Sequence, residues 1–431
     1  MRHSPFPTPL LMPPAHGQEG LLLCLLFLMV ASASLVIVDI IYASLMVVLT
    51  SLSLLLGIRI DRGNMPFIIM LLVYNLGALM ALQPHLNDEI AREFVVGTAF
   101  VAISSTFYML ILNENAIARF EAIRWGAVTG AIIASLAGIA GYLGYNDSAL
   151  LHGSRVAGTF KDPNVFGSAT AAAAVLLAGN ILTSPRLRLI KTGILLIIML
   201  GVFLSFSRGS WGNLVLGLMV LFGLTLITSN DAAMRSRVLI AGLVGVVVAG
   251  LMLAVVLTNE ETAALFADRF VLQKDYDAGP SGRFANQMRA IPDLLGRPLG
   301  HGPNRFSLFY PENPHNTYLM GFSTYGWLGG ITFLCFIITT IYVTMRAVFT
   351  RSPFQSYAVQ AAAMLLPHLI QNFQIDTDRW RHLFMIYGLC WGVAVVTQRY
   401  RGEYLAYAHN AYRAAANRWA GTPGRDQSSP A

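Results

Sequence analysis

The sequence predicts an all-α, polytopic integral membrane protein with about 12 transmembrane helices and one long periplasmic loop. Composition and pattern both point to this class. Of the 431 residues, 55% are hydrophobic and 12% are charged, and the mean hydropathy is +0.59. A soluble domain carries about 25% charged residues, so this composition excludes a soluble or disordered chain. The apolar residues also gather in runs that reach the ~20 residues needed to cross a bilayer.

Twelve runs have this length, and no polar linker divides them into soluble domains. Only Asp39 separates the first two runs, and the short segment Ser207–Ser210 joins the seventh to the eighth. Each run is expected to form one transmembrane helix. The runs are residues 20–38, 40–58, 65–82, 93–112, 123–143, 164–183, 189–207, 210–228, 237–257, 316–345, 355–373 and 380–397.

One long loop divides these helices into two groups, and a short segment precedes the first group. Residues 1–19 form a Pro-rich cytoplasmic segment, and no small-residue cleavage site follows it, so we expect no removed signal peptide. Residues 20–257 then carry the first nine helices. Residues 258–315 form the periplasmic loop with short helices, and residues 316–397 carry the last three transmembrane helices.

The loop and the tail have local patterns of their own. A helix start is expected at Asn259–Glu261, where acidic residues favour the positive end of the helix dipole. A second loop helix is expected from Arg283 to Leu295. The basic cytoplasmic tail, residues 398–431, interleaves arginines with tyrosines. That pattern is typical of an interfacial helix on an anionic leaflet.

The distribution of basic residues predicts that both termini are cytoplasmic. With this orientation, 17 of the 29 Lys and Arg residues lie in cytoplasmic segments, and six of the remaining 12 lie in the long loop. Short cytoplasmic loops are enriched in Lys and Arg, and this rule does not apply to long loops. The formal net charge of +7 therefore follows from topology and does not indicate a nucleic-acid partner.

A group of cations and one histidine lies at the predicted outer ends of the helices. Arg208 separates two runs, Arg283 and Arg289 lie in the long loop, and His315 opens the tenth run. Charges close to the hydrocarbon are costly and therefore indicate function. Arg matches phosphate oxygens two at a time, and His accepts protons near neutral pH. The group therefore predicts a diphosphate site with a general base.

Each residue also has a structural explanation when it is taken alone. Arg208 can extend from a helix end toward water, and a histidine at a helix end is more often structural than catalytic. Lys161 and Asp162 fit a surface turn before Pro163. Arg289 is placed to pair with Asp293, four residues later. The joint pattern supports function more strongly than any single residue does.

That pattern resembles the O-antigen ligase and O-antigen polymerase superfamily of bacterial envelope glycosyltransferases. Four blocks carry the resemblance in order, over residues 155–395. They are Gly-Thr-Phe-x-x-x-Asn (158–164), Ser-x-Ser-Arg-Gly (205–209), an Arg-led loop helix followed by Pro-Leu-Gly-x-Gly-Pro and an aromatic residue (283–306), and His-Asn-x-Tyr-Leu followed by Gly-x-x-Gly (315–329). Each block is weak alone, and together on one face they are fairly specific.

The resemblance implies a metal-independent, inverting glycosyltransferase without a cofactor, in the bacterial inner membrane with its active site facing the periplasm. The donor would be a glycan on a polyprenyl (undecaprenyl) diphosphate, and the acceptor a sugar of lipid A core or of a growing glycan. A separate chain-length regulator is a further expected partner. The catalytic residues would be His315 as the base and Arg208 and Arg283 on the leaving diphosphate. The substrate contacts would be Arg289, Lys161, Asn164, Asn316 and Tyr318.

One departure from the family pattern affects this mechanism. Many relatives carry an acidic residue just before the glycine that aligns with Gly326. This chain has Thr324 and Tyr325 there. If that acid orients the histidine, the detail of the mechanism changes, whereas the argument for diphosphate binding by arginines does not.

Four alternatives remain open at this point. The pairs Asp275/Asp277 and Asp376/Asp378 would be the acids of a metal-dependent glycosyltransferase, but about one such pair is expected by chance. Asp39, in the first outer loop, would be the catalytic base of another kind of membrane glycosyltransferase. A transporter or flippase of lipid-linked sugars would have the same topology, although we find no inverted repeat. Within the enzyme class, ligase and polymerase share one donor and differ in the acceptor.

Overall fold

A computed structural model describes residues 16–145, 150–258, 260, 263–264, 266–267 and 282–420. The described residues form thirteen α-helices and one short hairpin, which confirms the all-α class. The helices are α1 (His16–Ser32), α2 (Asp39–Leu56), α3 (Met65–Leu82), α4 (Glu89–Ile111), α5 (Ala116–Tyr142), α6 (Pro163–Thr183), α7 (Arg188–Leu204), α8 (Arg208–Thr228), α9 (Ala232–Val256), α11 (Arg283–Leu295), α12 (Thr317–Val348), α13 (Gln355–Gln371) and α14 (Arg381–Ala420). The hairpin pairs β1 (Leu151–His152) with β2 (Arg155–Val156).

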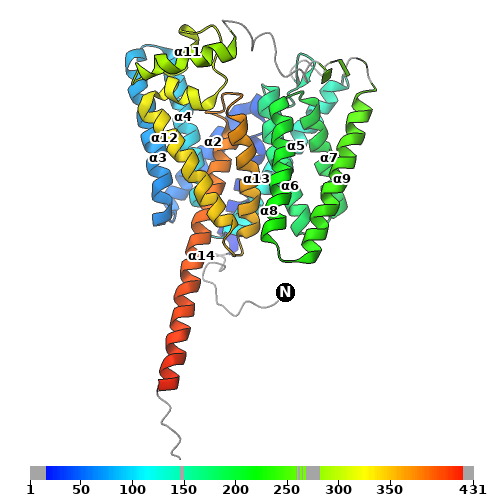
Figure 1. Ribbon diagram of the computed structural model, residues 1–431, viewed down its shortest axis with the longest axis vertical. Helices are drawn as coiled ribbons and strands as arrows, with labels where there is room; N and C mark the ends of the chain where they lie inside the picture. Colours follow the sequence, from blue (N-terminus) through cyan, green and yellow to red (C-terminus); the bar gives the residue numbers. More distant parts are fainter. Residues whose placement is uncertain are drawn as a thin grey trace, which may run out of the picture.

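Twelve of these helices run side by side as a bundle, and the short α11 lies across one end of it (Figure 1). We call that end the α11 end and the opposite end the far end. Consecutive bundle helices alternate in direction, so α6, α8, α12 and α14 all begin at the α11 end. Each of the twelve predicted runs coincides with one of the twelve bundle helices, and the predicted loop helix coincides with α11.

Seven helical segments in the described part of the chain are long and apolar enough to cross a membrane, by length and composition alone. This confirms the membrane class, while the count of about 12 spans and the periplasmic position of the loop stay predictions. The first helix is shorter than expected, because α1 ends at Ser32 and a 3₁₀ turn at Val36–Val38 precedes α2. The seven segments are Arg62–His85, Glu89–Ile111, Ala116–Tyr142, Pro163–Thr183, Arg208–Thr228, Ala232–Leu251 and Thr317–Val348.

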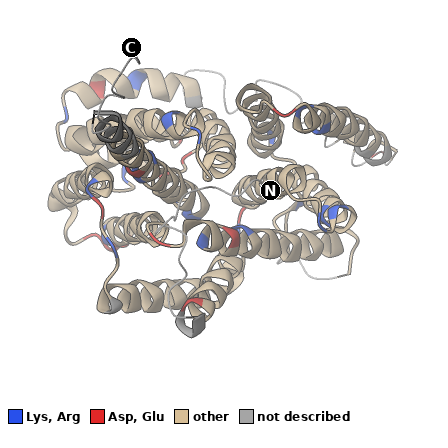
Figure 2. Ribbon diagram, turned by 90° about the horizontal axis from the view of Figure 1, so that it is seen from below, with Lys and Arg blue, Asp and Glu red and all other residues tan. Residues whose placement is uncertain are grey.

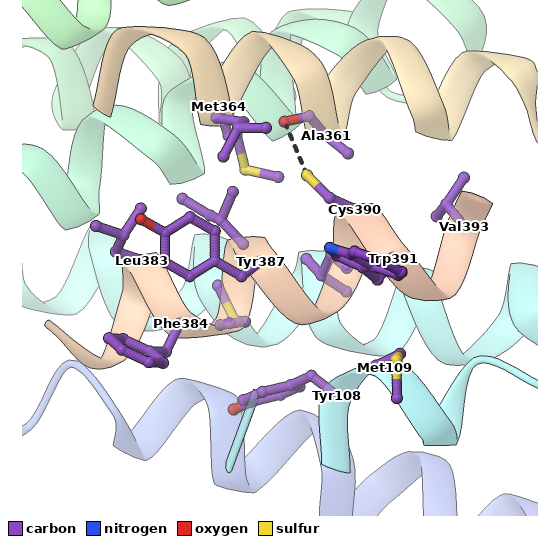
Figure 3. Packing of buried hydrophobic residues seen from close by; sticks show 14 of the residues in the cluster. Tyr108, Met109, Ala361, Met364, Leu383, Phe384, Tyr387, Cys390, Trp391 and Val393 are labelled. Atoms are coloured by element: carbon purple, nitrogen blue, oxygen red, sulfur yellow. Dashed lines mark hydrogen bonds between the residues drawn. The ribbon is translucent and has the colours of Figure 1, made fainter. Parts of the chain in front are cut away.

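The core lies where α14 packs between α4 and α13. Figure 3 shows Tyr387 and Cys390 of α14 among side chains of both neighbours, and the thiol of Cys390 lies 3.7 Å from the carbonyl oxygen of Ala361. The approach to α4 is close because α14 carries glycines there. A Cβ on Gly388 would lie 2.5 Å from the carbonyl oxygen of Ser105. Small residues that let helix backbones approach are the usual basis of packing in a membrane, where the lipid supplies no hydrophobic drive.

Helix α12 is broken at Gly326, where φ is +65°. A segment of the preceding connector fills the break. The carbonyl of Ser323 accepts the backbone N–H of His301 at 2.7 Å, and the N–H of Trp327 donates to the carbonyl of Pro298 at 2.9 Å. Backbone groups freed inside a membrane protein must find partners within the protein. The Pro-Leu-Gly-x-Gly turn therefore closes the break.

Polar side chains tie the helices together at the far end, which Figure 2 views directly. Arg399 of α14 donates to Asp61 at 2.6 Å, and Arg59 donates to the other oxygen of the same carboxylate at 3.1 Å. Arg119 of α5 makes a two-pronged contact with Glu19 of α1, with N···O distances of 3.0 and 2.9 Å. One pair joins α5 to α1, and the other joins α14 to the connector between α2 and α3. A buried charge that is paired costs far less free energy than a buried charge that is unpaired.

The basic tail does not form a separate helix. Residues 398–420 continue α14 without a break, and the helix leaves the bundle at the far end (Figure 1). Side chains 401–410 are exposed. The described part of the tail is therefore helical as a continuation of α14, and its place on a membrane interface stays a prediction. Between Arg399 and Ala420 the sequence offers only Gly402 as a weak helix breaker, and no proline.

Candidate functional site

Three helices begin around the last turn of α13 at the α11 end. The first turn of α8 touches it, since a Cβ on Gly209 would lie 2.6 Å from Nε2 of Gln371. The start of α12 is joined to it by the N–H of Thr317, which donates to the carbonyl of Asn372 at 2.8 Å. The start of α6 is joined to the start of α8, because the hydroxyl of Ser210 on α8 donates to the carbonyl of Asn164 on α6 at 3.2 Å. Three positive helix ends thus point to one region, which favours an anion there.

Arg208 is the first residue of α8 and is half-buried. The tight turn before it reverses the chain from α7 to α8. In that turn Phe206 has a φ of +46°, and the hydroxyl of Ser207 caps α8 by accepting the N–H of Ser210 at 3.3 Å. The Ser-x-Ser-Arg-Gly block therefore forms a capped helix start, and it places Arg208 at the positive end of the α8 dipole.

A buried network of hydroxyl and amide groups lies under this turn. Gln371 of α13 donates to the hydroxyl of Ser168 at 2.9 Å, and it accepts from the amide of Asn213 at 2.5 Å. Ser168 in turn lies 3.3 Å from the hydroxyl of Ser210. These groups form an inter-helix network that holds α6, α8 and α13 in register.

His315 lies just before α12, with a φ of +45° and a side chain that is 40% exposed. Its Nδ1 is 3.8 Å from Oδ2 of Asp376, which lies in the connector between α13 and α14. The other carboxylate oxygen of Asp376 accepts the backbone N–H of Asn316 at 2.9 Å. One carboxylate therefore holds the backbone beside the histidine and also faces its ring, an arrangement that suits a general base and its orienting group.

Asn316 and Tyr318, which closely follow His315, are engaged within the protein. The amide oxygen of Asn316 caps α12 by accepting the N–H groups of Tyr318 and Leu319 at 3.1 and 3.2 Å. The hydroxyl of Tyr318 donates to the carbonyl of Leu369 at 2.7 Å. Asn316 therefore caps α12, and Tyr318 holds the start of that helix against α13.

The upstream block is built around another helix start. Asp162 caps α6 by accepting the N–H groups of Asn164 and Val165 at 2.6 and 3.1 Å. The amide oxygen of Asn164 accepts from Arg155 at 2.9 Å, and Nε of Arg155 donates to the carbonyl of Ser205 at 3.0 Å. Lys161 is exposed beside this cap. Arg155 thus links the upstream block to the turn that carries Arg208.

Arg283 and Arg289 lie on α11. Arg283 is the first residue of that helix, and its side chain lies outside the described part of the structure. Arg289 is exposed and donates to the amide oxygen of Asn286 at 2.5 Å. The expected pairing of Arg289 with Asp293 is wrong, because Asp293 instead accepts from Arg297 at 2.8 Å.

Asp293 also anchors the connector that fills the α12 break. Its second oxygen lies 2.8 Å from Nε2 of His301, and Nδ1 of His301 lies 2.9 Å from the hydroxyl of Ser323 on α12. The hydrogen bonds from Arg297 and from His301 lower the pKa of Asp293 to about 2. Burial lowers the pKa of His301, and its bond to Asp293 partly opposes that effect. The neutral imidazole therefore bridges α11 to α12.

No group of three or more His, Cys, Asp or Glu side chains within the described residues is placed to hold a metal ion. Asp376 faces His315, whereas Asp378 accepts from the hydroxyl of Tyr325 at 2.8 Å. Asp275 and Asp277 lie outside the described residues, as does the side chain of Asp39. The predicted helix start at Asn259–Glu261 lies mostly outside them too.

Two hollows in the protein surface lie away from these residues. One of about 550 Å³ opens on α4 and is lined by Glu89, Arg92 and Phe100 among others. The other, of about 190 Å³, lies at the far end between α6, α8 and α13. Neither is lined by Arg208 or His315. The candidate site is therefore defined by the starts of α6, α8 and α12 and by the pair His315–Asp376, because these provide the charged groups that glycosyl or proton transfer requires.

Sequence reasoning missed two residues of this site. Asp376 was set aside as half of a chance acidic pair, and Arg155 lies just upstream of a recognised block. No local pattern marks either residue. The signal for Asp376 is its place in the connector that follows Gln371 and Asn372, the polar residues at the end of α13, because that connector passes the start of α12.

The fold and site together define a class: a polytopic helical membrane protein whose polar, histidine-bearing site lies at one end of the bundle. Within the chain, residues 193–334 match the family model described as O-antigen ligase. The match includes Arg208, Arg283 and His315, and it confirms the resemblance to the O-antigen ligase and polymerase superfamily. It supports an O-antigen ligase-related bacterial membrane enzyme. No curated protein matches the chain.

Proposed function

We propose that the protein is a membrane glycosyltransferase that moves a glycan from undecaprenyl diphosphate to the hydroxyl of an acceptor sugar. The observation that carries the proposal is the joint position of Arg208 and His315. They flank the starts of α8 and α12, and both starts contact the last turn of α13. We propose that a cation for the diphosphate and a base for the acceptor meet in the region around the end of α13.

The transfer is a single displacement at the anomeric carbon. The acceptor oxygen forms a bond to that carbon, the bond from the carbon to the diphosphate oxygen breaks, and the acceptor proton passes to His315. Arg208, with Arg283, balances the charge that develops on the leaving diphosphate. Attack opposite the leaving group inverts the anomeric configuration. This chemistry requires no metal ion and no cofactor.

Asp376 takes the orienting role in this proposal. Its carboxylate faces Nδ1 of His315 at 3.8 Å and stabilises the imidazolium that forms when the proton is taken up. The acid expected just before Gly326 is replaced by Tyr325, whose hydroxyl is bonded to Asp378. The mechanism therefore draws its carboxylate from the connector before α14, sixty-one residues after the histidine.

The remaining predicted contacts divide into two groups. Lys161 and Arg289 are exposed at the α11 end and are proposed to contact the substrate. Asn164, Asn316 and Tyr318 use their side-chain oxygens within the protein. We propose that these three act by positioning the helix starts on which Arg208 and His315 lie.

The broken helix α12 favours an enzyme over a transporter. Transporters use broken helices near the bilayer midplane, where freed backbone groups bind the substrate or coupling ion. Here the groups freed at Gly326 are bonded to Pro298 and His301 of the connector. The break therefore serves to dock the loop, and the polar site lies at the helix ends.

In the proposed topology both termini are cytoplasmic and the α11 end faces the periplasm across the bacterial inner membrane. The Lys-Asp-Pro-Asn form of the upstream block, residues 161–164, resembles exopolysaccharide-type polymerases more than ligases. A ligase would use the same donor. Deletion of the gene followed by glycan analysis distinguishes them. Loss of a ligase strands long polymer on the lipid carrier, whereas loss of a polymerase leaves single repeat units.

Transfer by purified protein tests the proposal directly. Arg208→Ala and His315→Ala should each reduce transfer by at least ~10²-fold, the usual contribution of a charge stabiliser or a general base. Arg351→Ala, at the far end, is the matched control and should leave transfer unchanged. Each variant is first checked for insertion and a single peak in size-exclusion chromatography. Near-normal transfer by either site variant removes that residue from the mechanism.

A further inference from the structure

A lysine is buried at the far end, and among the described residues no carboxylate lies within ion-pair distance of it. Lys191 lies in the first turn of α7, and 6% of the residue is exposed. Its Nζ lies 3.4 Å from the hydroxyl of Ser184 and 5.9 Å from the centre of the Trp125 ring. No ion pair joins Lys191 to any acid in the described part of the chain. A covered charge of this kind requires a counter-ion.

The groups around Lys191 add positive charge. Arg186 lies in the connector between α6 and α7, and Arg188 is the first residue of α7. The charges of both act on Lys191 together with that of Arg124. Within the described residues, Nη2 of Arg188 and Nε of Arg124 are buried without a hydrogen-bond acceptor. The nearby acid Glu121 is already engaged, since it accepts from Arg124 and from the hydroxyl of Tyr357.

The start of α7 contributes further donors. Its cap residue is Leu187, with a φ of +56° and no side-chain hydrogen bond to the first turn. An uncapped helix start presents free N–H groups and the positive end of the helix dipole, both of which favour a phosphate. The preference of cytoplasmic loops for basic residues explains why Arg186 and Arg188 are present, but it does not explain a buried lysine.

The surface beside this cluster identifies the source of the anion. Leu187, Leu189 and Ile190 are 58%, 90% and 59% exposed, on the same turn of α7 as Lys191. Exposed apolar side chains of this kind can contact the acyl chains of a bound lipid. A soluble phosphate has no acyl chains and would make no contact with them. We propose that Lys191, Arg188 and the first turn of α7 bind the phosphate of an anionic phospholipid at the far end of the bundle. This site is independent of the proposed glycosyl transfer.

Native mass spectrometry of the full-length protein in detergent tests the proposal. The probes are phosphatidylglycerol, phosphatidylethanolamine and inorganic pyrophosphate, each added separately. We expect the wild-type protein to retain phosphatidylglycerol over phosphatidylethanolamine. Lys191→Gln and Arg188→Gln should each weaken that retention ~10-fold, the loss expected for one charge-assisted hydrogen bond. Lys191→Arg keeps the charge and should retain the lipid.

Arg346→Gln is the matched control, because Arg346 is an exposed cation at the same end on α12. It should retain phosphatidylglycerol as the wild type does. Equal retention by Lys191→Gln and wild type overturns the proposal, as does equal retention of the two lipids. Retention of pyrophosphate without either lipid overturns the assignment to a lipid and identifies a soluble phosphate. If Lys191→Gln does not give a single chromatographic peak, Arg188→Gln decides.

Discussion

The carboxylate of Asp376 lies 3.8 Å from Nδ1 of His315 and also accepts the backbone N–H of Asn316 at 2.9 Å. The histidine has a φ of +45°, a conformation that costs free energy for a residue with a side chain. The bond to the next N–H helps to hold that conformation. Asp376 therefore combines two functions, since it fixes the backbone at the histidine and faces the ring.

Asp376→Asn should separate these two functions. The amide oxygen still accepts the N–H of Asn316, but the negative charge facing His315 is lost. We expect the turnover number to fall ~10- to 100-fold with little change in the KM for the lipid-linked donor, because only proton uptake is affected. Steady-state transfer by purified protein measures both constants, and its pH profile should change shape.

Asp376→Ala removes both functions, so it should reduce turnover further and also lower the melting temperature. If the asparagine and alanine variants both keep wild-type turnover, Asp376 has no role in orienting the base. A fall in melting temperature with unchanged turnover would restrict the residue to a structural function.

Arg155 provides the second prediction. Its guanidinium donates to both Asn164 and Ser205, and so fixes the turn that carries Arg208. Arg155→Lys keeps the charge but lacks the planar fork needed for both contacts. We expect it to raise the donor KM ~10-fold with a smaller effect on turnover, because Arg208 is then held less firmly. Equal kinetics for Arg155→Lys and wild type would show that the link is unimportant.

Much of the fold follows from the sequence because bilayer thickness sets the length of each apolar run. Residues 65–82 form α3 as predicted, and the loop helix begins at Arg283 and ends at Leu295 as predicted. The break at Gly326 could not be predicted. It depends on bonds from Pro298 and His301, and a glycine within an apolar run gives no sign that another segment replaces its helical partners.

The site was predictable only where its residues lie in a local block. Arg208 and His315 stand beside cap residues and glycines that mark helix starts. Asp376 is sixty-one residues from His315, and Arg155 is fifty residues from Ser205. Both contacts depend on which helices become neighbours, and periodicity does not encode that choice.

The pKa of Asp293 leads to a prediction on pH dependence. Hydrogen bonds from Arg297 and His301 lower this pKa to about 2, below the ordinary value of 3.8. Because the folded pKa is the lower one, the carboxylate stabilises the fold above about pH 4, and that stabilisation is lost as the pH falls toward 2. Asp293→Asn should therefore lower the melting temperature at pH 7 by about 2 °C, a change that corresponds to ~1 kcal/mol.

The difference between Asp293→Asn and wild type should shrink between pH 4 and pH 3, because the carboxyl group of Asp293 takes up a proton in the unfolded chain there while it stays ionised in the folded protein. Differential scanning fluorimetry in detergent across this range gives the two curves. Asp231→Asn is the control, since that aspartate lies in an exposed far-end turn. A difference that persists unchanged to pH 3 would contradict the lowered pKa of Asp293.

Gly326 gives the final prediction, because the α12 break requires a residue without a side chain. Its φ is +65°, and a Cβ there would lie 2.5 Å from the carbonyl oxygen of Pro298. Gly326→Ala should therefore destabilise the protein by about 1–3 kcal/mol and displace the connector that carries His301. Gly223→Ala is the matched control, since a Cβ at that position on α8 meets nothing within 4 Å and alanine favours a helix. Thermal unfolding in detergent should show a clear fall for Gly326→Ala and no fall for Gly223→Ala. A Gly326→Ala protein as stable as the wild type would mean that the connector does not fill the break.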